Sequence, residues 1–220
     1  MLEMLEIDPP GEVCGSVIWL HGLGADGHDF EPLLREWDLS ARLGVRFVLP
    51  HAPVRPVTLN AGARMRAWYD IRDLSLTEGE DIEGIEAARG QIVGLLEAET
   101  RRGIPRDRLV LAGFSQGGAL SLYTALRMEA PPAAVLGLSC YLPLRERLAQ
   151  AVRARPGTLA IRIDHGDQDP VVPLAAAERA RDAIAATGHA VEFHVWPMAH
   201  SLCPPQIDSL HAWLVARFGA

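Results

Sequence analysis

Residues 108–128 read RLVLAGFSQGGALSLYTALRM, and the fold class can be predicted from the order of residue types in this segment. It opens with a short apolar run that is typical of a buried β-strand, and it closes with a run that is typical of a helix. Between the two runs lies GFSQG (113–117), a serine with a glycine two positions away on either side. The stretch predicts a strand, a sharp turn at Ser115 and then a helix.

The positions of the two glycines have a steric explanation. A serine at a sharp strand-to-helix turn adopts a strained backbone conformation, and only very small residues two positions away avoid a clash with it. The turn exposes the hydroxyl above the edge of the sheet, and the helix that follows directs its N-terminal amides and the positive end of its dipole toward it. We therefore predict that Ser115 is a nucleophile. Ser121, Ser139 and Ser201 lack this setting and are expected to be structural.

A serine hydroxyl is a weak nucleophile near neutral pH, so it needs a base and an acid that orients the base. In sheet enzymes with this turn, the serine comes first in the chain, the acid second and the histidine third. The acid is expected in HGDQDPVVP (165–173), which follows a predicted strand. We favour Asp169, because Pro170 holds it extended, over Asp167, which suits a turn.

The base is expected in PMAHS (197–201), a loop after the next predicted strand. His200 has the right position there. The other candidates are expected to be structural, either because they lie in or beside regular elements or because they precede a glycine at a strand end. These histidines are His21, His165, His189, His194 and His211.

Apolar runs and amphipathic stretches alternate along the rest of the chain. Strands are predicted at 15–20, 45–49, 108–114, 134–139, 158–164 and 190–196, and helices near 30–43, 79–102, 116–129, 144–154, 173–187 and 204–218. This alternation indicates an α/β fold with a mostly parallel sheet and helices on both faces. Residues 2–7 could add an antiparallel edge strand. Residues 50–78 show neither the periodicity of a helix nor that of a strand. This long irregular segment is a candidate for one wall of the substrate-binding site.

Composition narrows the class of protein. The 220 residues suit one domain over 1–220, and a net charge of −7 argues against nucleic-acid binding. The N-terminus lacks a signal-peptide pattern, no apolar run is long enough for stable membrane insertion, and three widely spaced cysteines suit a reduced compartment. We expect a cytoplasmic protein. No metal-ligand motif is present, so no metal is predicted.

A second glycine pattern lies in HGLGADGHDF (21–30), whose Gly22-x-Gly24-x-x-Gly27 spacing matches a dinucleotide-binding fingerprint. Such a site needs a helix that opens within the glycines and an acid at the end of the second strand. Pro32 places the helix start near 29–31, after the glycines, and the second strand ends in PHAP (50–53) without an acid. We therefore expect no cofactor.

Taken together, these segments resemble the bacterial carboxylesterases related to acyl-protein thioesterases and lysophospholipases, within the α/β-hydrolase fold. The matching segments cover nearly the whole chain: HGLGADG (21–27), FVLPHAPVRPVTLNAG (47–62), WYDI (68–71), GFSQGGA (113–119), HGDQDPVVP (165–173) and PMAHSLCP (197–204). The resemblance implies a single-domain α/β-hydrolase without a large lid, and a Ser115, Asp169 and His200 triad. It also implies that the backbone N–H groups of Leu23 and Gln116 form the oxyanion hole.

The expected function is hydrolysis of a carboxylic ester by a carboxylesterase that acts on a small-molecule ester or thioester. Acyl-protein thioesterase and lysophospholipase are the alternatives, and a non-catalytic binding protein of this fold is the alternative from another class. Trp68 is a candidate wall of the acyl groove, or else a core aromatic residue. A homodimer is possible by resemblance. One departure from the family pattern is Ala199, where relatives usually carry glycine; a positive φ there would strain alanine.

Overall fold

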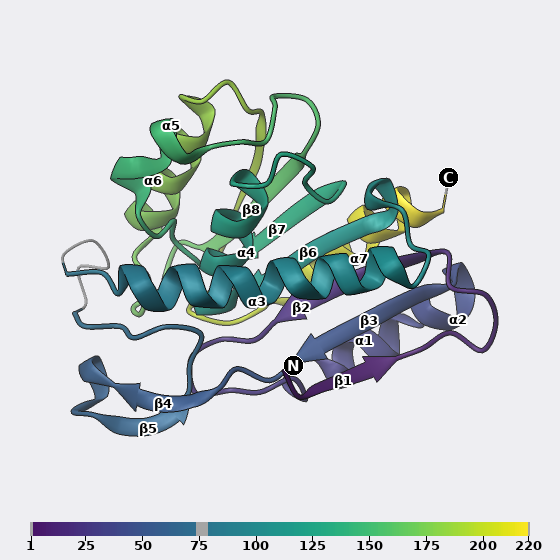
Figure 1. The fold of residues 1–220 in the computed structure, drawn as a ribbon, viewed down its shortest axis with the longest axis horizontal. Coiled ribbons are helices and arrows are strands. Elements are labelled where there is room, and N and C mark those ends of the chain that lie inside the picture. Colours follow the sequence, from purple (N-terminus) through teal and green to yellow (C-terminus); the bar gives the residue numbers. More distant parts are fainter. Residues whose placement is uncertain (1, 74–78, 220) are drawn as a thin grey trace.

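The computed structural model describes residues 2–73 and 79–219, and its main feature is a twisted seven-stranded sheet (Figure 1). Its strand order is β1-β3-β2-β6-β7-β8-β9. The strands are β1 (Met4–Ile7), β2 (Gly15–Leu20), β3 (Val45–Pro50), β6 (Leu109–Phe114), β7 (Ala134–Leu138), β8 (Ala160–Gly166) and β9 (Val191–Trp196). β1 is antiparallel to β3, and all the other neighbours are parallel, which confirms the predicted mostly parallel sheet and its antiparallel edge strand.

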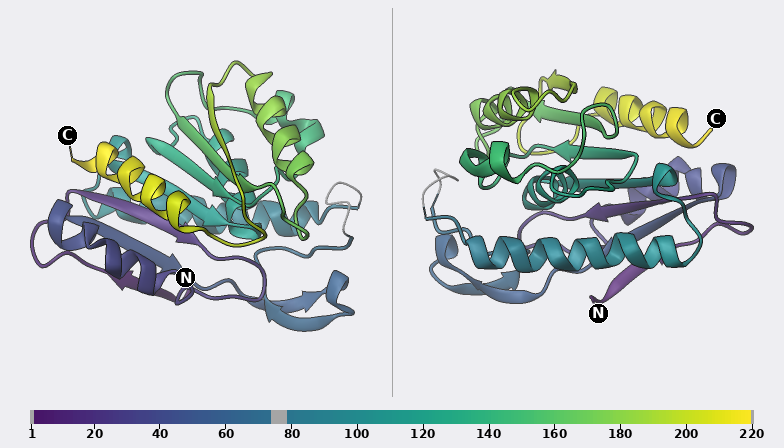
Figure 2. Two further views of the ribbon diagram at one scale, coloured as in Figure 1. Left: turned by 180° about the vertical axis from the view of Figure 1, so that it is seen from behind. Right: turned by 45° about the horizontal axis from the view of Figure 1, so that its top comes forward.

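Helices cover both faces of the sheet, as predicted (Figures 1 and 2). One face carries α3 (Ile82–Arg101), α4 (Gln116–Leu126) and α6 (Leu174–Ala185), and the other carries α1 (Glu31–Trp37), α2 (Leu39–Leu43) and α7 (Pro204–Phe218). The apolar side chains form one core on each side of the sheet. All residues of β2, β3 and β7 are buried, which explains why these strands read as continuous apolar runs.

Two predicted helices are shorter than expected. The predicted helix 30–43 is broken at Asp38, whose left-handed backbone (φ 53°) ends α1 and begins α2. The predicted helix 144–154 is reduced to a 3₁₀ turn and α5 (Leu148–Ala151). The chain leaves the helical path there because the N–H groups of Arg153 and Ala154 both bond to the carbonyl of Leu126 at the end of α4. In the second place, therefore, a tertiary contact overrides local periodicity.

The predicted irregular segment 50–78 contains a β-hairpin, β4 (Val54–Val57) and β5 (Ala63–Arg66), that lies outside the main sheet (Figure 1). The sequence does not predict this hairpin, because Pro53 and Pro56 lie in the segment and proline in an apolar run argues against a strand. The hairpin is fastened at its turn, where the Asp70 carboxylate accepts the N–H and hydroxyl of Thr58 at 2.7 and 2.6 Å. Residues 74–78 lie outside the described residues.

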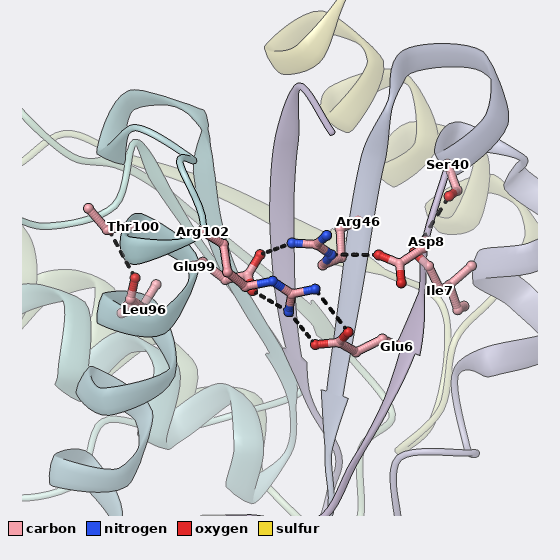
Figure 3. A network of polar contacts seen from close by, with 9 residues as sticks. All are labelled: Glu6, Ile7, Asp8, Ser40, Arg46, Leu96, Glu99, Thr100 and Arg102. Atoms are coloured by element: carbon pink, nitrogen blue, oxygen red, sulfur yellow. Dashed lines mark hydrogen bonds and ion pairs between the residues drawn. The ribbon is translucent and has the colours of Figure 1, made fainter. Parts of the chain in front are cut away.

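A charged network fastens the edge of the sheet to the end of α3 (Figure 3). The guanidinium of Arg46 on β3 donates to Asp8 at 2.6 Å and to Glu99 at 3.2 Å, and Arg102 donates to Glu99 and Glu6. Arg46 is 8% exposed and Glu99 is 2% exposed. Removal of one partner leaves the other charged and buried, which costs more than the pair itself contributes.

We therefore expect Glu99→Gln to lower the free energy of unfolding by about 3 kcal/mol. Arg35→Met is the matched control, because it breaks the exposed Glu31–Arg35 pair, which is worth about 0 to 1 kcal/mol. Urea unfolding followed by circular dichroism measures both changes. Equal effects of the two substitutions would contradict a stabilising role for the buried network.

Candidate active site

The turn at Ser115 has the strained geometry that the sequence predicts. Ser115 adopts φ 53° and ψ −120° between the end of β6 and the first residue of α4. A Cβ at Gly113 would lie 2.4 Å from the backbone of Gly117, and a Cβ at Gly117 would lie 2.4 Å from the carbonyl oxygen of Leu20. Neither position can therefore hold a larger residue. The turn places the Ser115 hydroxyl at the carboxyl end of the sheet, directly before the helix N-terminus.

A series of hydrogen bonds connects the three predicted triad residues. His200 Nε2 lies 3.0 Å from Ser115 Oγ, and His200 Nδ1 lies 2.7 Å from Asp169 Oδ2. These residues come from loops after β6, β8 and β9, which end at the same edge of the parallel sheet. The geometry can pass a proton between Ser115 and His200, and the carboxylate can hold the imidazole in the required tautomer.

Asp169 rather than Asp167 faces the histidine. The side chain of Asp169 is fully buried, and Oδ1 of its carboxylate accepts the N–H groups of Val171 and Val172 at 2.8 and 2.9 Å. These bonds stabilise the ionised form and fix the direction in which the carboxylate points. Asp167 is exposed, and its backbone N–H is bonded to the carbonyl of Trp196; among the described residues its carboxylate has no hydrogen-bond partner.

The glycine-rich loop of residues 21–27 lies against the turn at Ser115. A Cβ at Gly22 would lie 3.4 Å from the Cβ of Ser115, and the N–H of Gly24 is bonded to the carbonyl of Arg66 at 2.8 Å. Within residues 2–73 and 79–219, no acceptor bonds the N–H of Leu23 or the N–H of Gln116. These two N–H groups are free to donate to an oxygen atom bound beside Ser115. Helix α1 begins at Glu31, after all three glycines, as predicted.

His21 and the side chain of Gln116 hold this loop in place. His21 Nε2 accepts the N–H of Ala52 at 3.0 Å, so its proton is on Nδ1, which donates to the carbonyl of Gly22 at 2.7 Å. Gln116 accepts the N–H of Trp68 and donates to the carbonyl of Tyr69. Sequence reasoning identified His21 as a structural hydrogen bonder but assigned Gln116 only a backbone role. The side-chain role of Gln116 could have been inferred from the sequence, because a polar side chain at the start of an otherwise apolar helix needs hydrogen-bond partners.

The structure also places Trp68 and Ala199, the two further residues near the site. Trp68 is fully buried, and its indole donates to the carbonyl of His21 at 2.9 Å, so it packs in the core instead of lining an open groove. Ala199 has no positive φ, so alanine imposes no backbone strain on the loop that carries His200. This loop instead closes over Gly166, where a Cβ would lie 2.2 Å from the carbonyl oxygen of Met198.

Burial lowers the pKa of His21 below its usual value of 6.5, and burial also lowers the pKa of His165. The folded protein therefore binds fewer protons than the unfolded chain just below pH 6.5. The contribution of these residues to stability is complete above pH 6.5 and is lost as the pH falls through their folded pKa values. The raised pKa of His28 acts in the opposite direction, but His28 is fully exposed.

We expect the free energy of unfolding to be smaller at pH 5.5 than at pH 7.5, as measured by urea titration. Nitrogen-15 spectra of the imidazoles supply the site-specific measurement: His21 and His165 should remain neutral at pH 6.5. Titration of either ring at or above that pH would contradict the assignment.

Within the described residues, no helix is long and apolar enough to cross a bilayer. The same residues contain no cluster of three or more histidine, cysteine or acidic side chains that could hold a metal ion.

The sheet order, the helices on both faces and a serine turn between β6 and α4 define an α/β-hydrolase. Residues 6–216 match the Phospholipase/Carboxylesterase family. The chain belongs to this family, and it is an ester hydrolase.

Similarity to individual proteins extends over nearly the whole chain. The chain is 37% identical over 212 residues to acyl-protein thioesterase 1 of Neurospora crassa, covering 92% of this chain and 86% of the relative. It is 38% identical over 231 residues to acyl-protein thioesterase 1 of Mycosarcoma maydis, covering 97% and 96%. The crystal structure of Zea mays acyl-protein thioesterase 2 superposes with a TM-score of 0.85 at 30% identity, covering all of both chains. These relatives are fungal and plant proteins, so they do not support the narrower resemblance to bacterial carboxylesterases.

Proposed function

We propose that this protein is an acyl-protein thioesterase that works through an acyl-enzyme on Ser115. The observation that carries the chemistry is the series of hydrogen bonds from Ser115 through His200 to Asp169. A binding protein of this fold would need neither the three side chains in contact nor a strained serine. The substrate class is supported by the fungal relatives at 37% and 38% identity that bear this name.

In the first half of the reaction, Ser115 Oγ attacks the thioester carbonyl while His200 Nε2 takes its proton. The negative charge on the carbonyl oxygen is stabilised by the N–H groups of Leu23 and Gln116 and by the positive end of the α4 dipole. Asp169 stabilises the imidazolium that forms. The C–S bond then breaks, and His200 gives the proton to the leaving thiol.

In the second half, His200 removes a proton from a water molecule that attacks the acyl-enzyme. The tetrahedral intermediate uses the same two amides and collapses to release the carboxylic acid. The proton returns from His200 to Ser115 Oγ, so the enzyme regains its starting state. One site therefore serves both steps, which is why the loop at residues 21–27 must be held firmly by His21.

The carboxylesterase reading is the second candidate, since the family description includes carboxylesterases. The discriminating experiment compares an S-octanoyl cysteine peptide with the matched O-octanoyl serine peptide and with lysophosphatidylcholine. We expect kcat/KM to be about tenfold higher for the thioester, a difference of 1.4 kcal/mol in transition-state stabilisation. A preference for the oxygen ester would favour the carboxylesterase, and a preference for the lipid would favour the lysophospholipase.

We also propose that residues 1–220 form one hydrolase domain, in line with the family match over 6–216. The cytoplasmic location and the possible homodimer stay predictions from the sequence. Sedimentation at micromolar concentrations would test the dimer.

A further inference from the structure

A cavity of about 380 Å³ lies beside His200, between α1, α7 and the turn at Ser115. It is lined mainly by apolar side chains, and Asp29, His200 and Ser201 supply its polar lining. Phe30, Leu33, Phe114, Leu202 and Ile207 form the apolar lining. Four of them are only partly buried although they pack against the core on this face. Apolar surface that the protein leaves open next to a nucleophile is typical of a substrate subsite.

The position of the cavity decides which part of a substrate it can hold. The leaving atom must lie against His200 Nε2, because that nitrogen protonates it. The rest of the leaving group then extends past His200 and the residues that follow it, and these line the cavity. The described residues of its lining include neither Leu23 nor Gln116, whose backbone N–H groups are proposed to bind the carbonyl oxygen of the substrate. The cavity is therefore placed for the leaving group and not for the acyl chain.

Phe114 shapes the inner wall of this cavity. Its ring lies 4.9 Å from the ring of His200 and 5.9 Å from the ring of Phe30. These contacts fix an apolar surface on the residue that directly precedes the nucleophile. A side chain of the leaving group that packs on Phe114 therefore also approaches His200, which couples recognition to proton transfer.

The charge at the cavity rim is negative. Asp29 is exposed, and no side chain among the described residues bonds its carboxylate. The nearby Glu31 is paired with Arg35 and His28, and the described lining contains no arginine. A cationic group on the leaving group would be attracted to this rim, and an anionic one would be repelled.

We infer that this cavity is a leaving-group subsite for peptide thiols in which an aliphatic residue adjoins the acylated cysteine and a basic residue follows. The inference rests on the proposed acyl-transfer function and deepens it by naming the peptide that the enzyme prefers. Leu33 and Ile207 receive the aliphatic side chain, and Asp29 attracts the basic residue. Burial of one leucine side chain of the peptide in this cavity supplies most of the difference in kcat/KM between peptides. The reason is that burial of an apolar side chain contributes more free energy than one exposed charge pair.

The test uses S-octanoyl thioesters of three peptides, LCLR, GCGR and LCLE, together with S-octanoyl methanethiol. The acyl group is constant, so differences in kcat/KM report the leaving group alone. We expect LCLR to exceed GCGR about tenfold, and to exceed LCLE about two- to fivefold. Asp29→Asn should abolish the second preference and preserve the first.

Leu33→Trp fills the cavity and should lower the ratio of kcat/KM for LCLR over methanethiol about tenfold. Leu43→Trp is the matched control, because Leu43 is a partly buried residue that packs on the same core but does not line the cavity. An unchanged ratio in Leu33→Trp would overturn the proposal. The ratio is also measured with the hexadecanoyl thioesters of the same leaving groups; a loss in Leu33→Trp that grows with the acyl chain would overturn the proposal too, since the cavity would then hold the acyl group.

Failure of the subsite and failure of the thioesterase function give different results. If no thioester is cleaved but O-octanoyl serine peptides are, the thioesterase proposal fails. The serine peptides LSLR, GSGR and LSLE then measure the subsite by the same ratios. Equal kcat/KM for all three peptides in a series that is cleaved would overturn the subsite alone.

Discussion

Replacement of Ser115 by alanine should lower kcat about 10⁴- to 10⁶-fold and leave the protein folded. The loss is large because no other described group can form the acyl-enzyme, and His200 has no hydroxyl to deprotonate. Alanine carries the same Cβ as serine, so the backbone strain at φ 53° is unchanged in this variant. Thermal unfolding should therefore change little compared with activity.

Intact mass after treatment with a fluorophosphonate measures the same site without any choice of substrate. The wild-type protein should gain one adduct, and peptide mapping should place it on Ser115. Ser209→Ala is the control, because it removes a half-buried serine whose hydroxyl is bonded to Arg162 and not to His200. Labelling should persist in that variant and vanish in Ser115→Ala. An adduct on another serine, or retained activity in Ser115→Ala, would contradict the assignment.

The sequence predicts the site well where one local pattern sets the geometry. The strand, the serine turn and the helix at 108–128 follow from glycines whose absent side chains leave room for the turn. The bounds of α7 agree with the predicted helix 204–218, because Pro204 and Gly219 mark its two ends. Local chemistry therefore suffices where proline, glycine or a strained residue dictates the backbone.

The remaining features depend on contacts between distant segments. The shortened helix after Leu144 ends where Arg153 and Ala154 bond to the carbonyl of Leu126, a contact that periodicity does not report. The cavity beside His200 combines residues from α1, the turn at Ser115 and the start of α7, which lie far apart in the chain. Gln116 illustrates the same limit, since its side chain bonds Trp68 and Tyr69, more than forty positions earlier.

Asp169→Asn should lower kcat about 10⁴-fold, whereas Asp167→Asn should cost far less. The asparagine preserves the shape of the side chain, but its amide can present an N–H to His200 Nδ1. That contact favours the imidazole tautomer with its proton on Nε2, which can no longer accept the proton of Ser115. Asp167 is the matched control because it lies two residues away in the same loop and is exposed.

The two variants differ in what they remove from the triad. Loss of Asp169 removes the carboxylate that stabilises the imidazolium, whereas Asp167→Asn leaves that carboxylate in place. Initial rates at a saturating concentration of an octanoyl thioester measure kcat for both variants. A larger loss in Asp167→Asn than in Asp169→Asn would show that the carboxylate 2.7 Å from His200 does not orient the base.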